Sequence, residues 1–380
     1  MRRGWMNKYL LTGFLVLVLL LSGCILDRGD NSTNNNNPNK NQEEQQGNQK
    51  GIDNENKQKE SEKETVTIEK YYPIEENVRY VYEGKGNEYA SFDIYIDYAT
   101  ENKVQQRVNN GGTSLARIIE IKDGKLINRY SRGEAYYREN LLTAENGEEE
   151  ILLMEPLKVG TTWKLKDSRV RTITNLSADI STPSGNYKTI EVSTEGPNGK
   201  TLDYYAKGIG LVKTLFHSEG MEVSSSLSKL EKNVPFVQTI QFFYPNIDDD
   251  QLYFESKEIL FHTNDITKMV LEKTYKEAVP DTMNSVFTKN TKINSLYLNK
   301  DGNLYIDLNK AFLTEMVAGS GMEGLILQSI VNTFGHYYGV EKVYLTIDNE
   351  LYSSGHISLN KGEFLTVTPI EEAIDLQHSR

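Results

Sequence analysis

The sequence predicts a multi-domain protein in which an antiparallel all-β domain is followed by a small α+β domain, with helices on one face of a sheet. After a low-complexity N-terminal part, roughly 310 residues remain, which is more than one average core accommodates. The first half of this stretch contains short alternating apolar and polar runs separated by turn sequences, a pattern typical of all-β domains. The second half mixes such runs with two longer segments of helical periodicity.

The first 23 residues have the features of a signal peptide. Arg2, Arg3 and Lys8 precede an apolar run of 12 residues at positions 10–21. This run is shorter than the roughly 20 residues that a membrane-spanning helix needs, and it suits the apolar part of a signal peptide. The alternative to a lipoprotein signal is an ordinary secretory signal.

The sequence Leu21-Ser22-Gly23-Cys24 resembles a bacterial lipobox, and Cys24 is the only cysteine in the chain. The resemblance implies cleavage before Cys24 and attachment of diacylglycerol to its thiol. Two or more acyl chains, palmitate among them, give stable anchoring where one would be marginal. We therefore predict lipidation at Cys24 and a position on the extracytoplasmic face of the cell membrane. A mature chain without another thiol can use neither disulfides nor cysteine chemistry.

Charge and composition indicate the kind of partner. The chain has 42 basic and 54 acidic residues, and loss of the three basic residues of the leader would leave a net charge of −15. Such an acidic chain is a poor candidate for nucleic acid, and we expect a protein partner. Residues 24–64 are rich in Asn, Gln, Glu and Lys and cannot bury enough apolar surface to fold. They predict a flexible tether with an r.m.s. length of roughly 35 Å.

Residues 65–231 are predicted to form the antiparallel β domain, as a curved sheet or an open barrel. Residues 92–98 alternate strictly, as expected for a half-buried strand. Similar runs follow at 115–121, 135–139, 162–166, 169–173, 188–193, 202–206, 211–216 and 222–227. Turn sequences such as Asp123-Gly124 separate the runs. The many tyrosines could line a carbohydrate groove or form cross-strand pairs on a sheet face.

Residues 234–365 are predicted to form the α+β domain, with residues 366–380 as a C-terminal tail. Strands are expected at 237–244 and in two pieces at 252–254 and 257–261. A helix capped by Asn264 or Asp265 should follow and stop at Pro280. Asp301-Gly302 lies between two alternating runs and predicts a hairpin. A second helix and further strands give the order ββαββαββ.

The second helix is predicted to begin at Gly319-Ser320-Gly321-Met322-Glu323-Gly324. Ser320 and Glu323 have the spacing of a capping box, in which each side chain satisfies a free N–H at the helix start. Apolar residues at steps of three and four follow, and Gly339 suits the left-handed position after the helix end. The same glycines match the dinucleotide fingerprint, but no strand runs directly into them, and Glu323 would repel a pyrophosphate. We interpret the segment as a helix start.

The α+β part resembles the GerMN domain, a family named after a lipoprotein of sporulation and spore germination. The resemblance rests on residues 241–245, on residues 293–308, on Ile306-Asp307-Leu308-Asn309 followed by Ala311-Phe312, on residues 323–333, and on residues 343–348 with 355–357. It covers about 130 residues. The founding type has two tandem copies, whereas one copy follows a different β domain here. The resemblance implies a non-enzymatic module similar to ring-building domains of secretion and sporulation channels, which acts by protein–protein contact in the envelope.

Motifs for catalysis or metal binding were not found in the sequence. The five histidines include no pair at a ligand spacing such as i, i+4, so we predict no catalytic residue, cofactor or metal. The function expected is a non-enzymatic scaffold that binds envelope or sporulation proteins. The alternative is a lipoprotein that binds a sugar or an apolar ligand for a cell-wall or transport process. A wall-degrading enzyme would require two carboxylates brought together in a cleft.

Overall fold

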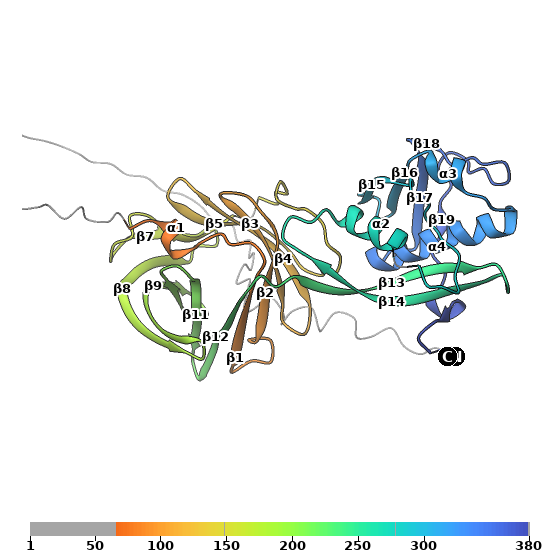
Figure 1. Ribbon diagram of the computed structural model, residues 1–380. Coiled ribbons are helices and arrows are strands. Elements are labelled where there is room, and N and C mark those ends of the chain that lie inside the picture. The colour runs from red at the N-terminus through yellow and green to blue at the C-terminus, as the bar shows by residue number, and fades with distance from the viewer. Residues whose placement is uncertain (1–65, 148, 278, 379–380) are drawn as a thin grey trace, which may run out of the picture.

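The computed structural model describes residues 66–147, 149–277 and 279–378. The predicted leader, the tether and Cys24 lie outside these residues. A large curled sheet and an α+β region lie next to each other (Figure 1), and each has its own hydrophobic core. The predicted fold class is confirmed. The predicted boundaries 65–231, 234–365 and 366–380 stay predictions.

The curled sheet has 12 strands, and each strand is antiparallel to its neighbours. A short helix, α1 (Ile68–Tyr71), precedes it. The strands are β1 (Val78–Lys85), β2 (Phe92–Ala99), β3 (Lys103–Asn109), β4 (Ser114–Lys122), β5 (Lys125–Arg132), β6 (Glu150–Met154), β7 (Thr162–Lys164), β8 (Val170–Thr182), β9 (Gly185–Gly196), β10 (Gly199–Ala206), β11 (Gly210–Ser218) and β12 (Met221–Lys232). Consecutive strands pair from β1 to β6 and from β7 to β12, and β12 returns beside β1.

The two ends of this sheet curl toward each other. The Trp163 indole on β7 donates a 3.0 Å hydrogen bond to the carbonyl oxygen of Ile151 on β6. Arg171 on β8 donates to the same oxygen at 2.6 Å. The inner face carries the apolar core, since alternate residues of a strand point to opposite faces. The curl therefore encloses an interior between the strands of its two halves.

Most of the predicted β runs are strands, and one prediction is wrong. Asp123 and Gly124 both have positive φ, at 51° and 65°, as a two-residue hairpin turn requires. Residues 135–139, predicted as a strand, form an irregular segment. Side chains of β3 satisfy its carbonyl groups: Arg107 donates to Ala135 and Tyr137, and Gln105 donates to Glu139. These bonds replace a sheet ladder.

The α+β region begins with a long hairpin, β13 (Phe236–Asn246) and β14 (Gln251–Phe261). A second sheet has the order β15-β16-β17-β18, with β19 also paired to β17 and β16 parallel to β17. The remaining elements are α2 (Thr267–Glu277), β15 (Ile293–Leu298), β16 (Leu304–Leu308), α3 (Ala311–Glu315), α4 (Ser320–Tyr338), β17 (Lys342–Ile347), β18 (Glu350–Leu351), β19 (Leu365–Thr366), a 3-10 turn (Ile370–Glu372) and β20 (Ile374–Asp375), which pairs with β14. The predicted hairpin at Asp301-Gly302 is present as β15 and β16.

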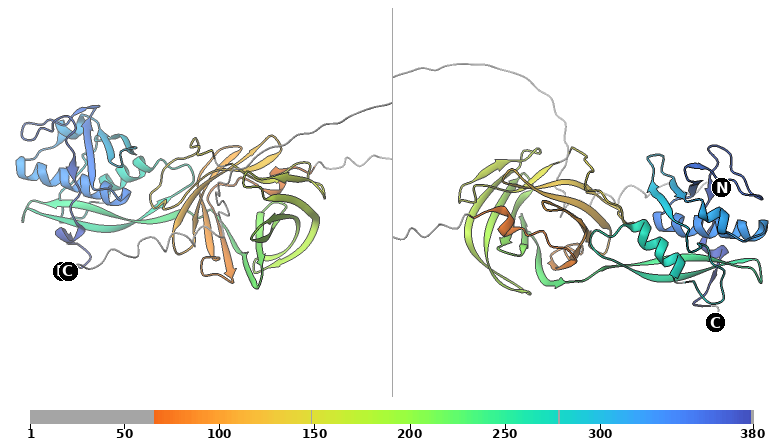
Figure 2. Two further views of the ribbon diagram at one scale, coloured as in Figure 1. Left: turned by 180° about the vertical axis from the view of Figure 1, so that it is seen from behind. Right: turned by 45° about the horizontal axis from the view of Figure 1, so that its top comes forward.

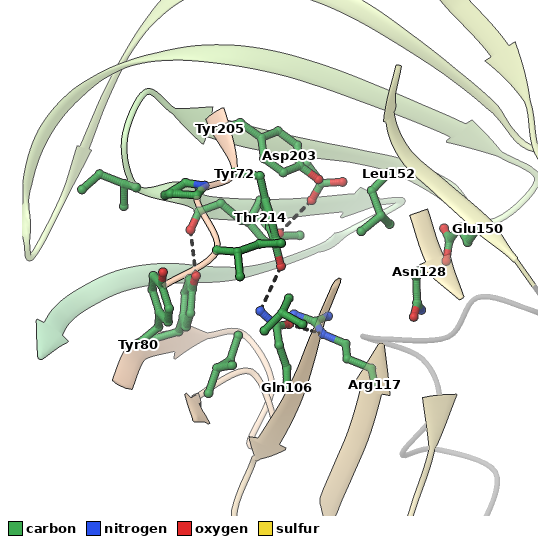
Figure 3. Close-up of a pocket in the computed structure, with 18 of the residues that line it drawn as sticks. Tyr72, Tyr80, Gln106, Arg117, Asn128, Glu150, Leu152, Asp203, Tyr205 and Thr214 are labelled. Carbon is green, nitrogen blue, oxygen red and sulfur yellow. Dashed lines mark hydrogen bonds between the residues drawn. The ribbon is translucent and has the colours of Figure 1, made fainter. Parts of the chain in front are cut away.

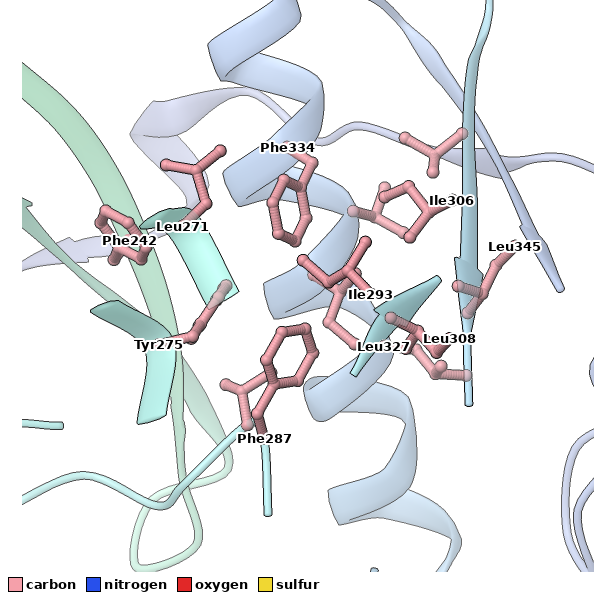
Figure 4. Close-up of a cluster of buried hydrophobic side chains, with 14 of the residues drawn as sticks. Phe242, Leu271, Tyr275, Phe287, Ile293, Ile306, Leu308, Leu327, Phe334 and Leu345 are labelled. Atoms are coloured by element: carbon pink, nitrogen blue, oxygen red, sulfur yellow. The ribbon is translucent and has the colours of Figure 1, made fainter. Parts of the chain in front are cut away.

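Helix α4 lies between the long hairpin and the second sheet (Figures 1 and 2). Figure 4 shows Phe334 and Leu327 of α4 between Phe242 of the hairpin and Leu345 of the sheet. Because both sides of α4 are covered, its Ser329, Asn332 and Thr333 are buried as well as its apolar face. Thr333 accepts the N–H of Phe243 at 2.9 Å, which ties the helix to β13.

The start of α4 differs from the predicted capping box. Gly319 is the N-cap residue, and no side chain caps the helix. Glu323 is 2% exposed and accepts a 2.7 Å hydrogen bond from the Tyr352 hydroxyl, so its carboxylate serves the core and not the helix end. Gly339 adopts the predicted left-handed conformation, with φ 67° and ψ 38°.

Helix α2 also differs from its prediction. It begins at Thr267, and the nearby apolar residues Ile266 and Met269 are exposed. The buried face consists of Thr267, Leu271 and Tyr275, at steps of four. Asn264, predicted as a cap, instead accepts the N–H of Ala99 at 2.9 Å and so binds the curled sheet.

Polar side chains join the two halves of the molecule. Arg138, which is 1% exposed, donates to the Tyr98 hydroxyl at 3.0 Å and to the carbonyl oxygens of His262, at 2.9 Å, and Asp265. Arg107 forms a 2.8 Å ion pair with the buried Asp97 behind it. Because Arg138, Tyr98, Arg107 and Asp97 are buried, the contact is well defined in geometry. None of the helices in the described ranges has the length and apolar character needed to cross a membrane.

Candidate functional site

A cavity of about 150 Å³ lies inside the curled sheet, where strands from both of its halves face one another (Figure 3). The segment after α1 closes one side. Apolar side chains of β1, β2 and β3 form part of the wall, while β4, β5, β6, β8 and β10 supply charged and amide groups. The cavity thus has an apolar and a polar part, the usual character of a small-molecule site.

Three polar residues of the wall form a chain of hydrogen bonds. Gln106 on β3 donates to the Tyr72 hydroxyl at 2.9 Å, and Arg117 on β4 donates from Nε to Gln106 Oε1 at 2.7 Å. The Gln106 side chain is therefore fixed with its amide nitrogen toward Tyr72 and its oxygen toward Arg117. The hydrogen bond at Nε therefore fixes the plane of the Arg117 guanidinium.

An acidic group lies across the cavity on β10. Asp203 is 9% exposed, and its Oδ1 accepts a 2.7 Å hydrogen bond from the Thr214 hydroxyl on β11. Burial raises the pKa of the Asp203 carboxyl above its ordinary value of 3.8, and Arg171 and Thr214 offset part of this effect. Removing a carboxylate from water disfavours its charged form.

The other charged groups of the wall are paired. Arg171 forms a 2.7 Å ion pair with Glu150 and donates to the Thr194 hydroxyl at 2.9 Å. Arg169 pairs with Asp167 at 2.7 Å and with Glu150 at 3.4 Å. These contacts neutralise both arginines within the wall, so they stabilise it.

Four tyrosines border the cavity, at positions 72, 80, 82 and 205. Burial raises the pKa of each of these hydroxyls, so all four are neutral at physiological pH. The Tyr82 hydroxyl donates to the carbonyl oxygen of Leu211 at 2.7 Å. The sequence left open whether tyrosines of this region line a groove or pair across strands, and these four line the cavity.

Arg117 and Asp203 carry no motif that marks them as site residues in the sequence. Each lies in a run predicted as a strand, and each points to the same side as apolar or aromatic neighbours two residues away. A charged residue in phase with the buried face is the signal that could have found them. The lipidation residue Cys24 lies outside the described residues, so its role stays a prediction.

The glycine-rich segment at 319–324 opens α4, and Glu323 within it is bound to Tyr352. Across the described residues, no group of three or more His, Cys, Asp or Glu side chains is arranged to hold a metal ion.

A row of aromatic side chains lies on the second sheet of the α+β region, on the face opposite α4. Tyr297, Tyr305 and Tyr344 are cross-strand neighbours on β15, β16 and β17. Their ring centroids are 5.6 Å apart between the first two and 5.1 Å between the last two. Phe364 extends the row at 5.3 Å from Tyr344. We call these four residues the aromatic row; Tyr297 at its end is 47% exposed.

Comparison with known proteins concerns mainly the α+β region. The family model described as Germane, sporulation and spore germination, matches residues 241–353. No curated protein matches the chain in sequence.

Among solved structures, the tandem GerMN domains of the sporulation protein GerM from Bacillus subtilis are 18% identical. That match covers 34% of this chain and 46% of the other, with a TM-score of 0.28, so the chain spans about half the length of that structure. The first GerMN domain of the same protein is 19% identical over 37% of this chain and 98% of its own, with a TM-score of 0.24. A Bacteroides fragilis protein, provisionally described as exported and with a YmcC-like fold, is 13% identical over 43% of this chain and 99% of its own, with a TM-score of 0.29.

The family match, and not these structural likenesses, identifies the domain. It lies within the part of the chain whose residues resemble GerMN domains, and it contains α2, α4 and strands β15 to β18 of the second sheet. Residues 241–353 of this chain are therefore a Germane domain, also called GerMN, of the sporulation and spore germination family.

Proposed function

We propose that this protein is a lipid-anchored, non-enzymatic scaffold of the cell envelope whose Germane domain binds a partner protein in sporulation or germination. The aromatic row carries the proposal. Aromatic side chains are enriched at protein interfaces, where they bury large areas at low entropic cost. Here four of them are adjacent on the sheet face opposite α4, where Tyr297 is exposed and the other three are half-buried.

The experiment is crosslinking in intact cells with a tagged copy of the full-length protein. A Tyr297→Ser/Tyr344→Ser double variant should lose the crosslinked partner that the unchanged protein captures. A Met221→Ser variant is the control, because Met221 is 42% exposed, similar to Tyr297, and lies on β12 of the curled sheet. An unchanged crosslinking pattern in the double variant would remove the aromatic row from the proposal. A deletion strain that sporulates and germinates normally would remove the biological setting.

The anchor is tested separately. A Cys24→Ser variant should move from the membrane fraction to the soluble or secreted fraction, since the acyl chains would be lost. Persistence in the membrane fraction would contradict anchoring through Cys24.

The cavity in the curled sheet favours a second candidate function, the binding of a small ligand. Its polar groups are held in place by hydrogen bonds and its other part is apolar. A panel of neutral sugars, organic acids and apolar fragments, screened by protein-detected NMR, should give shifts at Tyr205 and Gln106. A panel without any shift at these residues would contradict ligand binding in the cavity.

A further inference from the structure

Two charged groups of the cavity are left over after the ion pairs of its wall are counted. Arg169 and Arg171 are matched by Asp167 and Glu150, and Glu75 at the rim is matched by Lys232 at 2.7 Å. The remaining groups are Arg117 and Asp203, which come from β4 and β10 and lie on different sides of the space (Figure 3). Charges shielded from water are normally paired, so the unpaired ones indicate what the cavity accepts.

The Arg117 guanidinium is only partly used by the wall of the cavity. Its Nε is used by Gln106 at 2.7 Å, and its two terminal nitrogens have no hydrogen-bond or ion-pair partner within the described ranges. A guanidinium with both terminal nitrogens available matches the two oxygens of a carboxylate. Gln106, itself held by Tyr72, fixes the orientation of the Arg117 guanidinium, so little entropy is lost when an anion binds.

Asp203 sets a limit on the charge of the ligand. Its Oδ1 accepts from Thr214, while Oδ2 has no hydrogen-bond partner in the described part of the chain and remains available to a hydroxyl group. A second negative charge on the ligand would be repelled by Asp203 and by Glu150, which also lines the cavity. The favoured ligand therefore carries one negative charge and is otherwise uncharged and hydroxylated.

The size of the cavity restricts the ligand further. Its volume is about 150 Å³, similar to the roughly 150 Å³ of an engineered cavity that takes up benzene and below the 300–1,000 Å³ of common ligand sites. This is room for a single ring. The walls include the aromatic rings of Tyr80, Tyr82 and Tyr205, against which the C–H groups of a ring can pack.

We propose that the cavity binds a single-ring, hydroxylated monocarboxylate of the uronic acid type, with its carboxylate on Arg117 and a hydroxyl on Asp203. This proposal rests on the ligand-binding function suggested above and names its ligand class.

The experiment is calorimetric titration of the full-length protein in detergent at pH 7 with three matched probes. Glucuronate should bind at one site, and glucose should bind at least tenfold more weakly because it lacks the carboxylate. Glucose 6-phosphate should also bind at least tenfold more weakly because its second charge faces Asp203. Equal affinity for glucuronate and glucose would overturn the role of Arg117, and failure of glucuronate to bind would overturn the ligand class.

Variants separate the site from general effects on folding. Arg117→Gln should lower glucuronate affinity at least tenfold and leave glucose binding unchanged, while Arg117→Lys should retain part of the affinity. Arg129→Gln is the matched control, since Arg129 lies on β5 and pairs with Glu120 and Glu149 outside the cavity. Asp203→Asn should improve binding of glucose 6-phosphate. If Arg117→Gln binds glucuronate like the unchanged protein, the proposal is wrong. Ligand binding as such would still be decided by the NMR panel.

Discussion

Arg138 donates a 2.9 Å hydrogen bond from Nη2 to the main-chain carbonyl oxygen of His262, and this bond crosses from the curled sheet to the α+β region. The same guanidinium also binds the carbonyl oxygens of Asp97, at 2.5 Å, and Asp265. Because the acceptors are main-chain atoms, the contact depends on the path of the backbone and not on the side chains that follow β14. These hydrogen bonds hold the curled sheet and the α+β region in a fixed relative orientation, and we call this contact the fixed joint.

Replacing Arg138 by Met is predicted to weaken this joint. The change keeps the length of the side chain but leaves several buried carbonyl oxygens unsatisfied, so we expect a loss of about 3–5 kcal/mol in the free energy of unfolding. Denaturant unfolding should change from one transition to two, as the halves uncouple. Arg132→Met is the control, since Arg132 is partly exposed and pairs with Glu139. Equal effects of the two variants would show that Arg138 has no special role in joining the halves.

The buried pair of Glu323 and Tyr352 allows a second test. Tyr352→Phe removes the hydroxyl that donates to Glu323 and leaves a carboxylate without this partner in the core, so a loss of about 1–3 kcal/mol is expected. Glu323→Gln/Tyr352→Phe should be more stable than Tyr352→Phe alone, because the charge is gone. Thermal unfolding of the two variants and the unchanged protein measures the difference. A double variant less stable than Tyr352→Phe would contradict a charge in this position.

Gly335 and Gly324 both lie in α4 but differ in the space around them, so their alanine variants can be compared. A Cβ at Gly335 would lie 2.2 Å from Cγ2 of Val367, whereas a Cβ at Gly324 meets nothing within 4 Å. Val367 is β-branched and stiff, so Gly335→Ala should destabilise the protein by about 1–3 kcal/mol. Gly324→Ala should stabilise it by about 0.5–1 kcal/mol through helix propensity. Similar melting temperatures for the two variants would show that the segment at Val367, which follows β19, moves aside without cost.

Asp203 predicts a specific dependence of stability on pH. Its folded-state pKa is raised above 3.8, mainly by burial, so between these two values the folded state holds a proton that the unfolded state has lost. The contribution of Asp203 to stability is therefore full below pH 3.8 and falls as the pH rises through the folded-state pKa.

Asp203→Asn removes this dependence. The difference in unfolding free energy between Asp203→Asn and the unchanged protein should grow in favour of the variant as the pH rises from 4 to 7. Urea unfolding at several pH values measures it, and Asp93→Asn, on the outer part of β2 and paired with Arg79, is the control. A difference that is constant with pH would contradict a raised pKa for Asp203.

Local sequence patterns predicted the elements whose burial is apolar and regular. The alternating runs of the sheet, the Asp301-Gly302 hairpin and the Gly339 helix end were all found this way, since each is determined by residues close in sequence. Strand β3 shows why others were missed: Gln105, Gln106 and Arg107 are buried yet polar, because they bind the irregular segment and the cavity residues. Their partners are distant in sequence, so no local period reveals them.

The candidate site was unpredictable for the same reason. Arg117 and Asp203 are 86 positions apart in the sequence, and only the curl of the sheet brings both of them to the same cavity. The capping box at Ser320 failed because Glu323 has a distant partner, Tyr352. A local motif no longer predicts the local structure when a residue distant in sequence binds one of its side chains.

The fixed joint at Arg138 also bears on how this molecule transmits force. The chain enters the curled sheet near α1, at the end away from the Germane domain (Figures 1 and 2). A pull applied at residue 66 would therefore act on one connected body, and the distance between residue 66 and the aromatic row would stay constant under load.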